Sequence, residues 1–338
     1  MKAAVYAGNQ SFDVKDIPTP EPGPDQVLLK VKYSAICGTD VHTFLYDQAP
    51  SGIVMGHEYC GTIAHVGADV TRWKVGDRVL GGGGAPLPGA GPAFVTDPRY
   101  KYREVGFTGR PLRGYAEYVV MEEWEPVLIP DGVSDEAASL CEPCAVAVRA
   151  VRHSKVKLGD KVAVLGAGPI GLFCIQAVKA AGAGAVYVSE PVPVRAEAAR
   201  NVGADLVIDP TGEDVVARLE ELTDGLGPDV VFDCAGATPT LDQAMNIVRR
   251  DGQVMLVAVA WTEVPLLPVD WMAREVSIQS TWGGRHEDWK IALELLRTGK
   301  IIVGPMLTSS SFIPLDDIQD AFESLIKPTT QLQMVVVP

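Results

Sequence analysis

The chain has 338 residues, 47% of them hydrophobic, and a formal net charge of −14 at pH 7. That length suggests two domains and is ample for sizeable apolar cores. The negative charge would repel phosphate, so it disfavours a nucleic acid or an anionic membrane as a partner and favours a small molecule.

Segments that could suggest export or a membrane span have simpler explanations. The opening MKAAVYAGNQSFDV has one lysine and no long apolar core, unlike a signal peptide. Residues 162–178 carry no charge, but a glycine-rich break divides them into a strand-like and a helix-like half. Six cysteines are scattered without the spacing of a disulfide framework, which is typical of a reducing compartment. We therefore expect a cytoplasmic protein.

The first 149 residues contain short β-branched runs separated by glycine and proline. The runs lie at residues 26–36, 59–67, 76–82 and 115–121. This pattern predicts an all-β barrel or a twisted sheet. Residues 81–113 show no clear periodicity and are predicted to form a long loop.

From about residue 150 the pattern changes to strands that alternate with helices. Strands are expected at residues 161–166, 185–190, 205–209, 229–236, 252–260 and 275–281. Helices are expected up to residue 181 and around 195–201, 213–222 and 240–249, with two more at 287–300 and 316–326. Such alternation is typical of an α/β fold with a doubly wound parallel sheet.

A glycine-rich turn, Gly166–Gly171, closes one predicted strand and opens a helix. Its first glycine permits a tight turn, Gly168 lets the backbone approach a pyrophosphate, and Gly171 lets the helix pack closely on the strand. Glu190 ends the next strand, where an acid can accept ribose hydroxyls and repel a 2′-phosphate. These features predict a Rossmann domain that prefers NAD to NADP, although Arg195 could neutralise such a phosphate.

Residue types that suit zinc gather in three short stretches, ICGTDVHTF, GHEYC and SLCEPCAVAV. A mixed set of thiolate, imidazole and carboxylate suits this metal, and three protein ligands with an exchangeable fourth position make a catalytic site. The candidate residues are Cys37, Thr39, Asp40, His42, His57, Glu58 and Glu142.

These stretches, together with VGDRV, YAEYVV and GAGPIG, resemble the zinc-dependent medium-chain alcohol dehydrogenases over essentially the whole chain. The branch that looks most similar contains the sorbitol, butanediol and threonine dehydrogenases. The resemblance implies a GroES-like β-barrel catalytic domain (1–149), a Rossmann doubly wound domain (150–285), and a C-terminal segment (286–338) that returns to the catalytic domain. It also implies oxidation of a secondary alcohol, either a polyol, a diol or a hydroxy-amino compound, to its ketone.

The resemblance assigns roles to the metal-site candidates. Cys37, His57 and either Glu58 or Glu142 would hold the catalytic zinc, and the choice between the two acids stays open. Asp40 would orient His57.

The resemblance also implies a proton relay from the substrate through Thr39 and the cofactor ribose to His42. The predicted catalytic residues are thus Thr39, His42 and Glu58.

Resemblance also suggests contacts to the cofactor and the substrate. The predicted cofactor contacts are Gly166, Gly168, Pro169, Ile170, Gly171, Glu190, Arg195, Val257, Ala258, Val259, Thr281 and Trp282. The substrate pocket is expected to draw on Phe44, Tyr46, Tyr115 and Trp282.

One departure from the family concerns a second zinc. Many relatives carry four cysteines in the loop after GDRV, which bind a structural zinc, whereas residues 81–113 contain no cysteine. We therefore expect one catalytic zinc per chain, no structural zinc, and a loop held by aromatic packing. The residues expected to pack there are Phe94, Tyr100, Tyr102 and Phe107.

Assembly and two alternative functions complete the expectations. The apolar strand at residues 275–281 predicts pairing into a homodimer or homotetramer. The alternatives are a zinc-free quinone or enoyl reductase and a non-catalytic NAD-binding structural protein.

Overall fold

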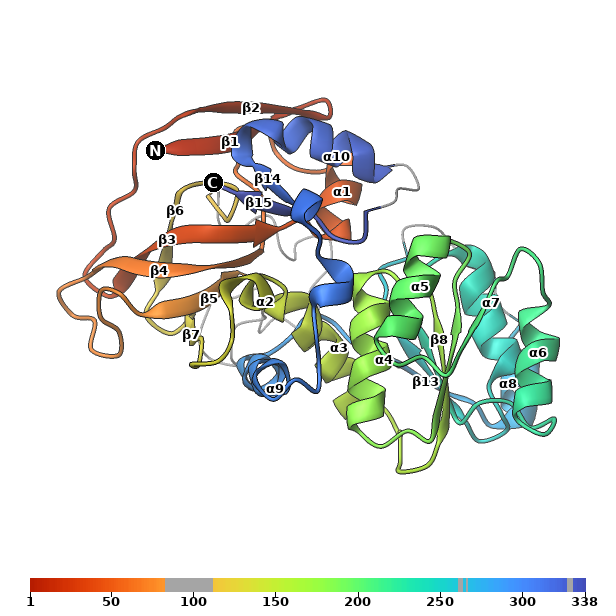
Figure 1. The fold of residues 1–338 in the computed structure, drawn as a ribbon. Helices are drawn as coiled ribbons and strands as arrows, with labels where there is room; N and C mark the ends of the chain where they lie inside the picture. The colour runs from red at the N-terminus through yellow and green to blue at the C-terminus, as the bar shows by residue number, and fades with distance from the viewer. Residues whose placement is uncertain (83–111, 261–263, 266, 327–330) are drawn as a thin grey trace. The chain divides into compact units, whose positions relative to one another are not determined.

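The computed structural model describes residues 1–82, 112–260, 264–265, 267–326 and 331–338 (Figure 1). The predicted loop packing of Phe94, Tyr100, Tyr102 and Phe107 lies outside these residues. Two compact units are present. The first comprises Met1–Glu142, Gly284–Arg297 and Leu307–Pro338, and the second comprises Pro143–Gly283 and Thr298–Met306.

Within the described residues, the first unit is built on a seven-stranded sheet in the order β14-β15-β3-β4-β5-β7, with β6 paired to β3. Its strands are β3 (Gln26–Ala35), β4 (Glu58–Val66), β5 (Arg78–Gly82), β6 (Tyr118–Glu122), β7 (Val127–Leu128), β14 (Phe312–Pro314) and β15 (Val335–Val337). A separate antiparallel hairpin joins β1 (Lys2–Gly8) to β2 (Ser11–Asp16). In the middle of β3, Leu29 and Val31 are buried and Lys30 and Lys32 are exposed, as expected for a sheet with one face on a core. The predicted β-rich first domain is therefore confirmed.

Some helices of the first unit lie where the sequence pattern predicted none, and others were expected. They are α1 (Gly38–Leu45), α2 (Asp135–Ser139) and the start of α3 (Cys141–His153), together with the expected α9 (His286–Arg297) and α10 (Ile318–Ile326). Short 3₁₀ turns lie at η4 (Ser309–Ser311) and η5 (Leu315–Asp317). The side chain of Cys37 accepts a hydrogen bond from Thr39 N and caps α1.

The second unit contains a parallel six-stranded sheet in the order β10-β9-β8-β11-β12-β13. Its strands are β8 (Lys161–Leu165), β9 (Ala185–Ser189), β10 (Leu206–Ile208), β11 (Val230–Asp233), β12 (Gln253–Leu256) and β13 (Ser277–Ser280). The strand order runs outward in both directions from β8 and β11, which confirms the doubly wound sheet. Ligands bind such sheets where the order reverses, at the carboxyl ends of the strands.

Helices cover the sheet of the second unit. They are α4 (Pro169–Ala180), α5 (Pro193–Asn201), α6 (Val215–Leu222), α7 (Thr238–Ile247) and α8 (Pro268–Arg274), followed by the 3₁₀ turn η3 (Gly304–Met306). In β8, Ala163 and Leu165 join the core under α6 and α7, while Val162 and Val164 are also fully buried. A strand buried on both faces explains why this stretch is continuously apolar.

The compact units do not coincide with the predicted spans 1–149, 150–285 and 286–338. The chain passes from one unit to the other inside α3, at residues 142 and 143, and Thr298–Met306 belongs to the second unit. Buried Gln176 of α4 explains this return, because its side chain donates to Ile302 O at 3.1 Å and accepts from Ile302 N at 2.7 Å. The tail is thus divided between the units.

No helix in the described ranges combines the length and apolar character needed to cross a bilayer.

Candidate metal centre and dinucleotide-binding turn

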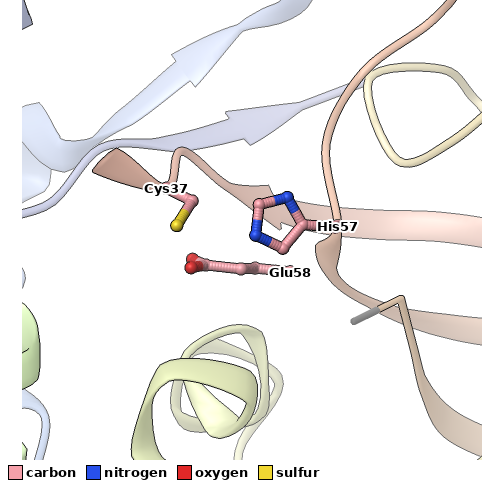
Figure 2. Close-up of side chains that lie close together, drawn as sticks. All are labelled: Cys37, His57 and Glu58. Atoms are coloured by element: carbon pink, nitrogen blue, oxygen red, sulfur yellow. The ribbon is translucent and has the colours of Figure 1, made fainter. Parts of the chain in front are cut away.

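Three side chains of the first unit converge on one point. Cys37, His57 and Glu58 offer a sulfur, a ring nitrogen and a carboxylate oxygen that all lie within 4.8 Å of one another. Figure 2 shows the thiol, the imidazole and the carboxylate close together. The neighbouring backbone places them, since Cys37 follows β3, Glu58 begins β4, and Ala35 pairs with Glu58 in the antiparallel ladder.

Burial and mutual charge shape the acid–base properties of this group. Burial raises the pKa of Glu58 to about 8, and the charge of Glu142 adds to the shift. Loss of hydration raises the pKa of the Cys37 thiol to about 11, and the charge of Glu58 adds to the shift. Burial alone would lower the pKa of His57, but the charges of Asp40 and Cys37 outweigh it and raise that pKa well above its usual value.

The residues present fit a divalent metal ion. Glu58 is 2% exposed, and its Oε2 has no hydrogen-bond partner among the described residues. A cation among these groups would stabilise the thiolate and the carboxylate, and thiolate, imidazole and carboxylate are the ligands zinc takes in proteins.

Glu142, the second candidate acid, lies in the first turn of α3 and is also buried. Burial raises its pKa, and the charge of His57 lowers it in part. Its charge reaches Glu58, but its carboxylate is not among the ligand atoms that lie within 4.8 Å of one another. In this geometry Glu58, and not Glu142, lies with Cys37 and His57.

Asp40 lies beside His57 as the resemblance implied. Asp40 Oδ1 is 3.3 Å from His57 Nδ1, at ion-pair distance but without the alignment of a hydrogen bond. Asp40 is fully buried, and its Oδ2 accepts a hydrogen bond of 2.8 Å from the Tyr115 hydroxyl.

The two relay candidates lie on α1. Thr39 and His42 are both partly exposed, and the His42 ring packs against that of Tyr46 with centroids 6.1 Å apart. His42 Nδ1 lies 2.7 Å from Gly38 O. Positions 39, 42 and 46 are three and four residues apart, so they share one face of the helix. Both relay candidates therefore lie on the helix that begins directly after Cys37.

The glycine turn of the second unit is shaped by close backbone approach. Gly166 has φ +90°, and a Cβ on Gly171 would lie 2.0 Å from Gly166 O. A Cβ on Gly168 would meet nothing within 4 Å. The first and third glycines are thus required by the fold, while Gly168 leaves its surface open for a ligand such as a pyrophosphate.

Glu190 follows β9 and is held against the glycine turn. Its Oε2 accepts a hydrogen bond of 2.6 Å from Ala167 N, and its Oε1 accepts one of 2.9 Å from Val192 N. Arg195 lies in the first turn of α5, and its Nε is buried without a hydrogen-bond partner among the described residues. The acid and the arginine therefore both lie on the segment that follows β9, and the acid contacts the glycine turn that follows β8.

Comparison with known families matches two parts of the chain to two family models. Residues 23–131 match the family described as "Alcohol dehydrogenase GroES-like domain", and residues 169–298 match "Zinc-binding dehydrogenase". The (R,R)-butanediol dehydrogenase of Bacillus subtilis is 35% identical, with 100% of both chains covered. The chain belongs to the zinc-binding alcohol dehydrogenase family.

Other curated relatives agree with this assignment. A sorbitol dehydrogenase of Halalkalibacterium halodurans is 33% identical, covering 91% of this chain and 92% of the relative. An L-threonine 3-dehydrogenase of Caldanaerobacter subterraneus is also 33% identical, covering 94% of this chain and 93% of the relative. The resemblance stated from the motifs is confirmed, and the enzyme is a dehydrogenase of the alcohol and polyol class.

Solved structures of related dehydrogenases have the same fold as this chain. The 2R,3R-butanediol dehydrogenase of Bacillus subtilis superposes with a TM-score of 0.88 at 34% identity, covering 100% of this chain and 99% of that one. A zinc-binding dehydrogenase of Sinorhizobium meliloti bound to NADP gives a TM-score of 0.89 at 30% identity, with 100% and 99% covered. The GroES-like and Rossmann-like parts of the enzyme are thereby confirmed.

The predicted substrate pocket needs correction at two residues. Phe44 and Tyr115 are 1% and 0% exposed and belong to the apolar core, so the prediction that they line a pocket is wrong. Phe44 lies on the inner face of α1 and stacks on Phe12 with ring centroids 5.5 Å apart. Tyr46 and Trp282 are 51% and 49% exposed.

The remaining cofactor candidates follow two neighbouring strands of the enzyme. Val257, Ala258 and Val259 come after β12, and Thr281 and Trp282 come after β13. Because all six strands are parallel, these segments lie at the same edge of the sheet as the glycine turn.

Asp233 organises this edge and was not singled out from the sequence. Its Oδ1 accepts hydrogen bonds from Ala235 N, Gly236 N and Thr240 Oγ1. Its backbone oxygen accepts from the amides of residues 257 and 258, which ends β12 earlier than predicted. The sequence feature that could have indicated Asp233 is its position as an acid at the end of the apolar run DVVFD.

Proposed function

We propose that this enzyme uses zinc and NAD to interconvert a secondary alcohol and its ketone. The observation that carries the proposal is the convergence of Cys37, His57 and Glu58 in a chain that also contains the Gly166–Gly171 turn. The related enzymes are named for butanediol, sorbitol and threonine, in which a hydroxyl is accompanied by a further hydroxyl or an amine. We infer the same class of substrate, a diol, a polyol or a hydroxy-amino compound.

Cys37, His57 and Glu58 would hold the zinc, with Glu142 as the alternative third ligand. When bound, the metal would act as a Lewis acid toward the substrate oxygen. One zinc per chain is proposed, because residues 81–113 contain no cysteine. Cys141 and Cys144 are both fully buried, and the Cys141 thiol donates to Trp289 O at 3.8 Å, so this pair is part of the packing.

Thr39 and His42 would carry the proton released from the alcohol. Thr39 lies two residues from Cys37 on α1, and its amide donates to the Cys37 sulfur at 3.4 Å. His42 is partly exposed at the next turn, where an imidazole can pass a proton to water. Their positions on one helix face support a relay that leads away from the metal centre.

NAD is proposed as the preferred cofactor. The Glu190 carboxylate lies at the glycine turn, where its charge would disfavour a 2′-phosphate. NADP is the alternative, because a structural relative binds it and Arg195 Nε lacks a hydrogen-bond partner among the described residues. The segments after β12 and β13 would complete the contacts to the dinucleotide.

A homodimer or homotetramer is proposed for the assembly. β13 is the edge strand of the six-stranded sheet, and Ile278 on it is 40% exposed. Leu267, Val269 and Met272, just before this strand, are also exposed apolar residues. A cytoplasmic location is proposed because all six cysteines are free thiols.

The experiment that tests the proposed function is a cofactor-reduction screen over secondary alcohols, run with NAD and with NADP. Zinc-loaded protein should reduce NAD with at least one diol, polyol or hydroxy-amino alcohol. The same protein stripped by a chelator should be inactive and regain activity when zinc is added back. Full activity of the stripped protein would contradict the proposal and favour the zinc-free reductase.

A further inference from the structure

Tyr115 is a fully buried tyrosine that reaches the metal centre from a distant part of the sequence. Its hydroxyl donates to Asp40 Oδ2 at 2.8 Å, and it also lies 3.5 Å from Ala35 O. We propose that Tyr115 is a positioning residue that fixes the orientation of His57, acting through Asp40 and through Gly56. The inference rests on the proposed function, since it takes His57 to be a metal ligand.

The first route runs through the buried carboxylate. Asp40 is fully buried, with one oxygen bound to Tyr115 and the other 3.3 Å from His57 Nδ1. The Tyr115 hydroxyl binds one oxygen of this buried carboxylate and so limits its rotation, which determines that the other oxygen faces the imidazole. This directs Nδ1 toward Asp40 and leaves the other ring nitrogen available to a metal.

The second route runs through the backbone that leads into His57. Tyr115 N donates to Met55 O at 3.0 Å, and Gly114 N donates to Gly56 O at 2.9 Å. These two bonds join the segment before Tyr115 to the segment before His57.

The tyrosine ring also determines the residue type at position 56. Gly56 has φ +92°, and a Cβ there would lie 2.7 Å and 2.8 Å from two ring carbons of Tyr115. The ring thus occupies the space that a side chain would need, and the chain can enter β4 along this path only with glycine at that position. Tyr115 therefore acts on the side chain of His57 through Asp40 and on its backbone through Gly56.

Packing around the ring allows the hydroxyl to be removed by itself. Tyr115 packs edge-on against Phe322 of α10, with ring centroids 5.9 Å apart and an interplanar angle of 87°. In Tyr115→Phe this aromatic contact stays and only the donor to Asp40 is lost. Tyr6 offers a matched control, because it is equally buried and donates to a different carboxylate, Asp47 Oδ1, at 2.5 Å.

The experiment compares wild type, Tyr115→Phe, Asp40→Asn, their double variant and the control Tyr6→Phe. Zinc affinity is measured by competition with a chromophoric chelator, and the coordination geometry by the absorption spectrum of the cobalt-loaded protein. Thermal unfolding of the chelator-stripped protein measures how much each substitution lowers the stability of the fold in the absence of metal.

We expect Tyr115→Phe to weaken zinc binding about tenfold, in the range known for groups that orient metal ligands, and to shift the cobalt spectrum. The double variant should bind zinc as Asp40→Asn does, because both changes break one chain of contacts. Tyr6→Phe should lower thermal stability and leave zinc affinity and the cobalt spectrum unchanged.

Zinc affinity and cobalt spectrum unchanged in Tyr115→Phe would overturn the inference, as would additive effects in the double variant. If Tyr115→Phe does not fold, Phe322→Leu loosens the same ring and keeps its hydroxyl, and an unchanged spectrum there would overturn it equally. A wild-type protein that binds no zinc would overturn the proposed function as well, so the two failures are distinguishable.

Discussion

The metal centre and the glycine turn are built in opposite ways. At the metal centre, function depends on side-chain atoms that converge from the end of β3 and the start of β4. At the glycine turn it depends on the absence of side chains, since a Cβ on Gly171 would lie 2.0 Å from a backbone oxygen. Removing atoms should therefore damage the first site, whereas adding atoms should damage the second.

The largest effect is expected from Cys37→Ala. Losing the thiolate should release the metal and lower turnover by roughly 10³-fold or more, because a Lewis acid supplies several kcal/mol to the reaction. NAD affinity, measured by fluorescence titration, should stay within about twofold, because the glycine turn belongs to the other compact unit.

Cys60→Ala is the matched control for this variant, since Cys60 is a buried thiol of β4 outside the metal group. It should keep its zinc and its turnover. Loss of NAD binding together with zinc in Cys37→Ala would break the comparison between the two sites.

Gly171→Ala should be the most damaging single methyl at the turn. The new Cβ would meet Gly166 O, and overpacking of this kind costs about 1–3 kcal/mol or more, so the melting temperature should fall by several degrees. Gly168→Ala is the matched control, because its Cβ would meet nothing within 4 Å. That variant should melt like wild type but bind NAD more weakly; equal melting temperatures for both variants would contradict the account.

His42→Ala should give a smaller and pH-dependent effect. A base positioned on α1 contributes about 10²-fold to proton transfer, and hydroxide can replace it when the pH is high. The rate of alcohol oxidation should thus fall more near neutral pH than in alkaline buffer. A pH–rate profile that is lowered equally at every pH would remove His42 from the relay.

Glu190→Gln should give the smallest effect, a weaker preference for NAD over NADP. Two unit charges about 4 Å apart in water interact by about 1 kcal/mol, so the ratio of the two affinities should change about fivefold. Glu197→Gln, an exposed acid on α5, is the control and should change nothing. A wild-type enzyme that prefers NADP would show that Glu190 does not discriminate against the phosphate.

The same contrast explains what could be read from the sequence. The glycine turn is local, and its spacing, the strand before it and the helix after it all lie within one short stretch, so its place in the fold was predictable. The metal group is spread over distant stretches, and only the residue types and the family resemblance indicated that Cys37, His57 and Glu58 would meet.

Side-chain direction is what the sequence did not reveal. α1 is only eight residues long and begins with glycine, so the sequence shows no helical periodicity that would predict it. Once the helix is known, Phe44 falls four residues after buried Asp40 and faces the core, while Thr39 and His42 face outward. The prediction that Tyr115 lines the pocket is wrong for a similar reason. The position of an aromatic residue near a motif does not indicate which way its side chain points.

The central claim, that the three converging side chains form one catalytic zinc site, is tested most directly by elemental analysis of protein purified without chelators. We expect about one zinc per chain in the wild type, and we expect Cys37→Ala to lose it. Two tightly held zinc ions would contradict the single site, and no zinc in a fully active protein would contradict the mechanism as a whole.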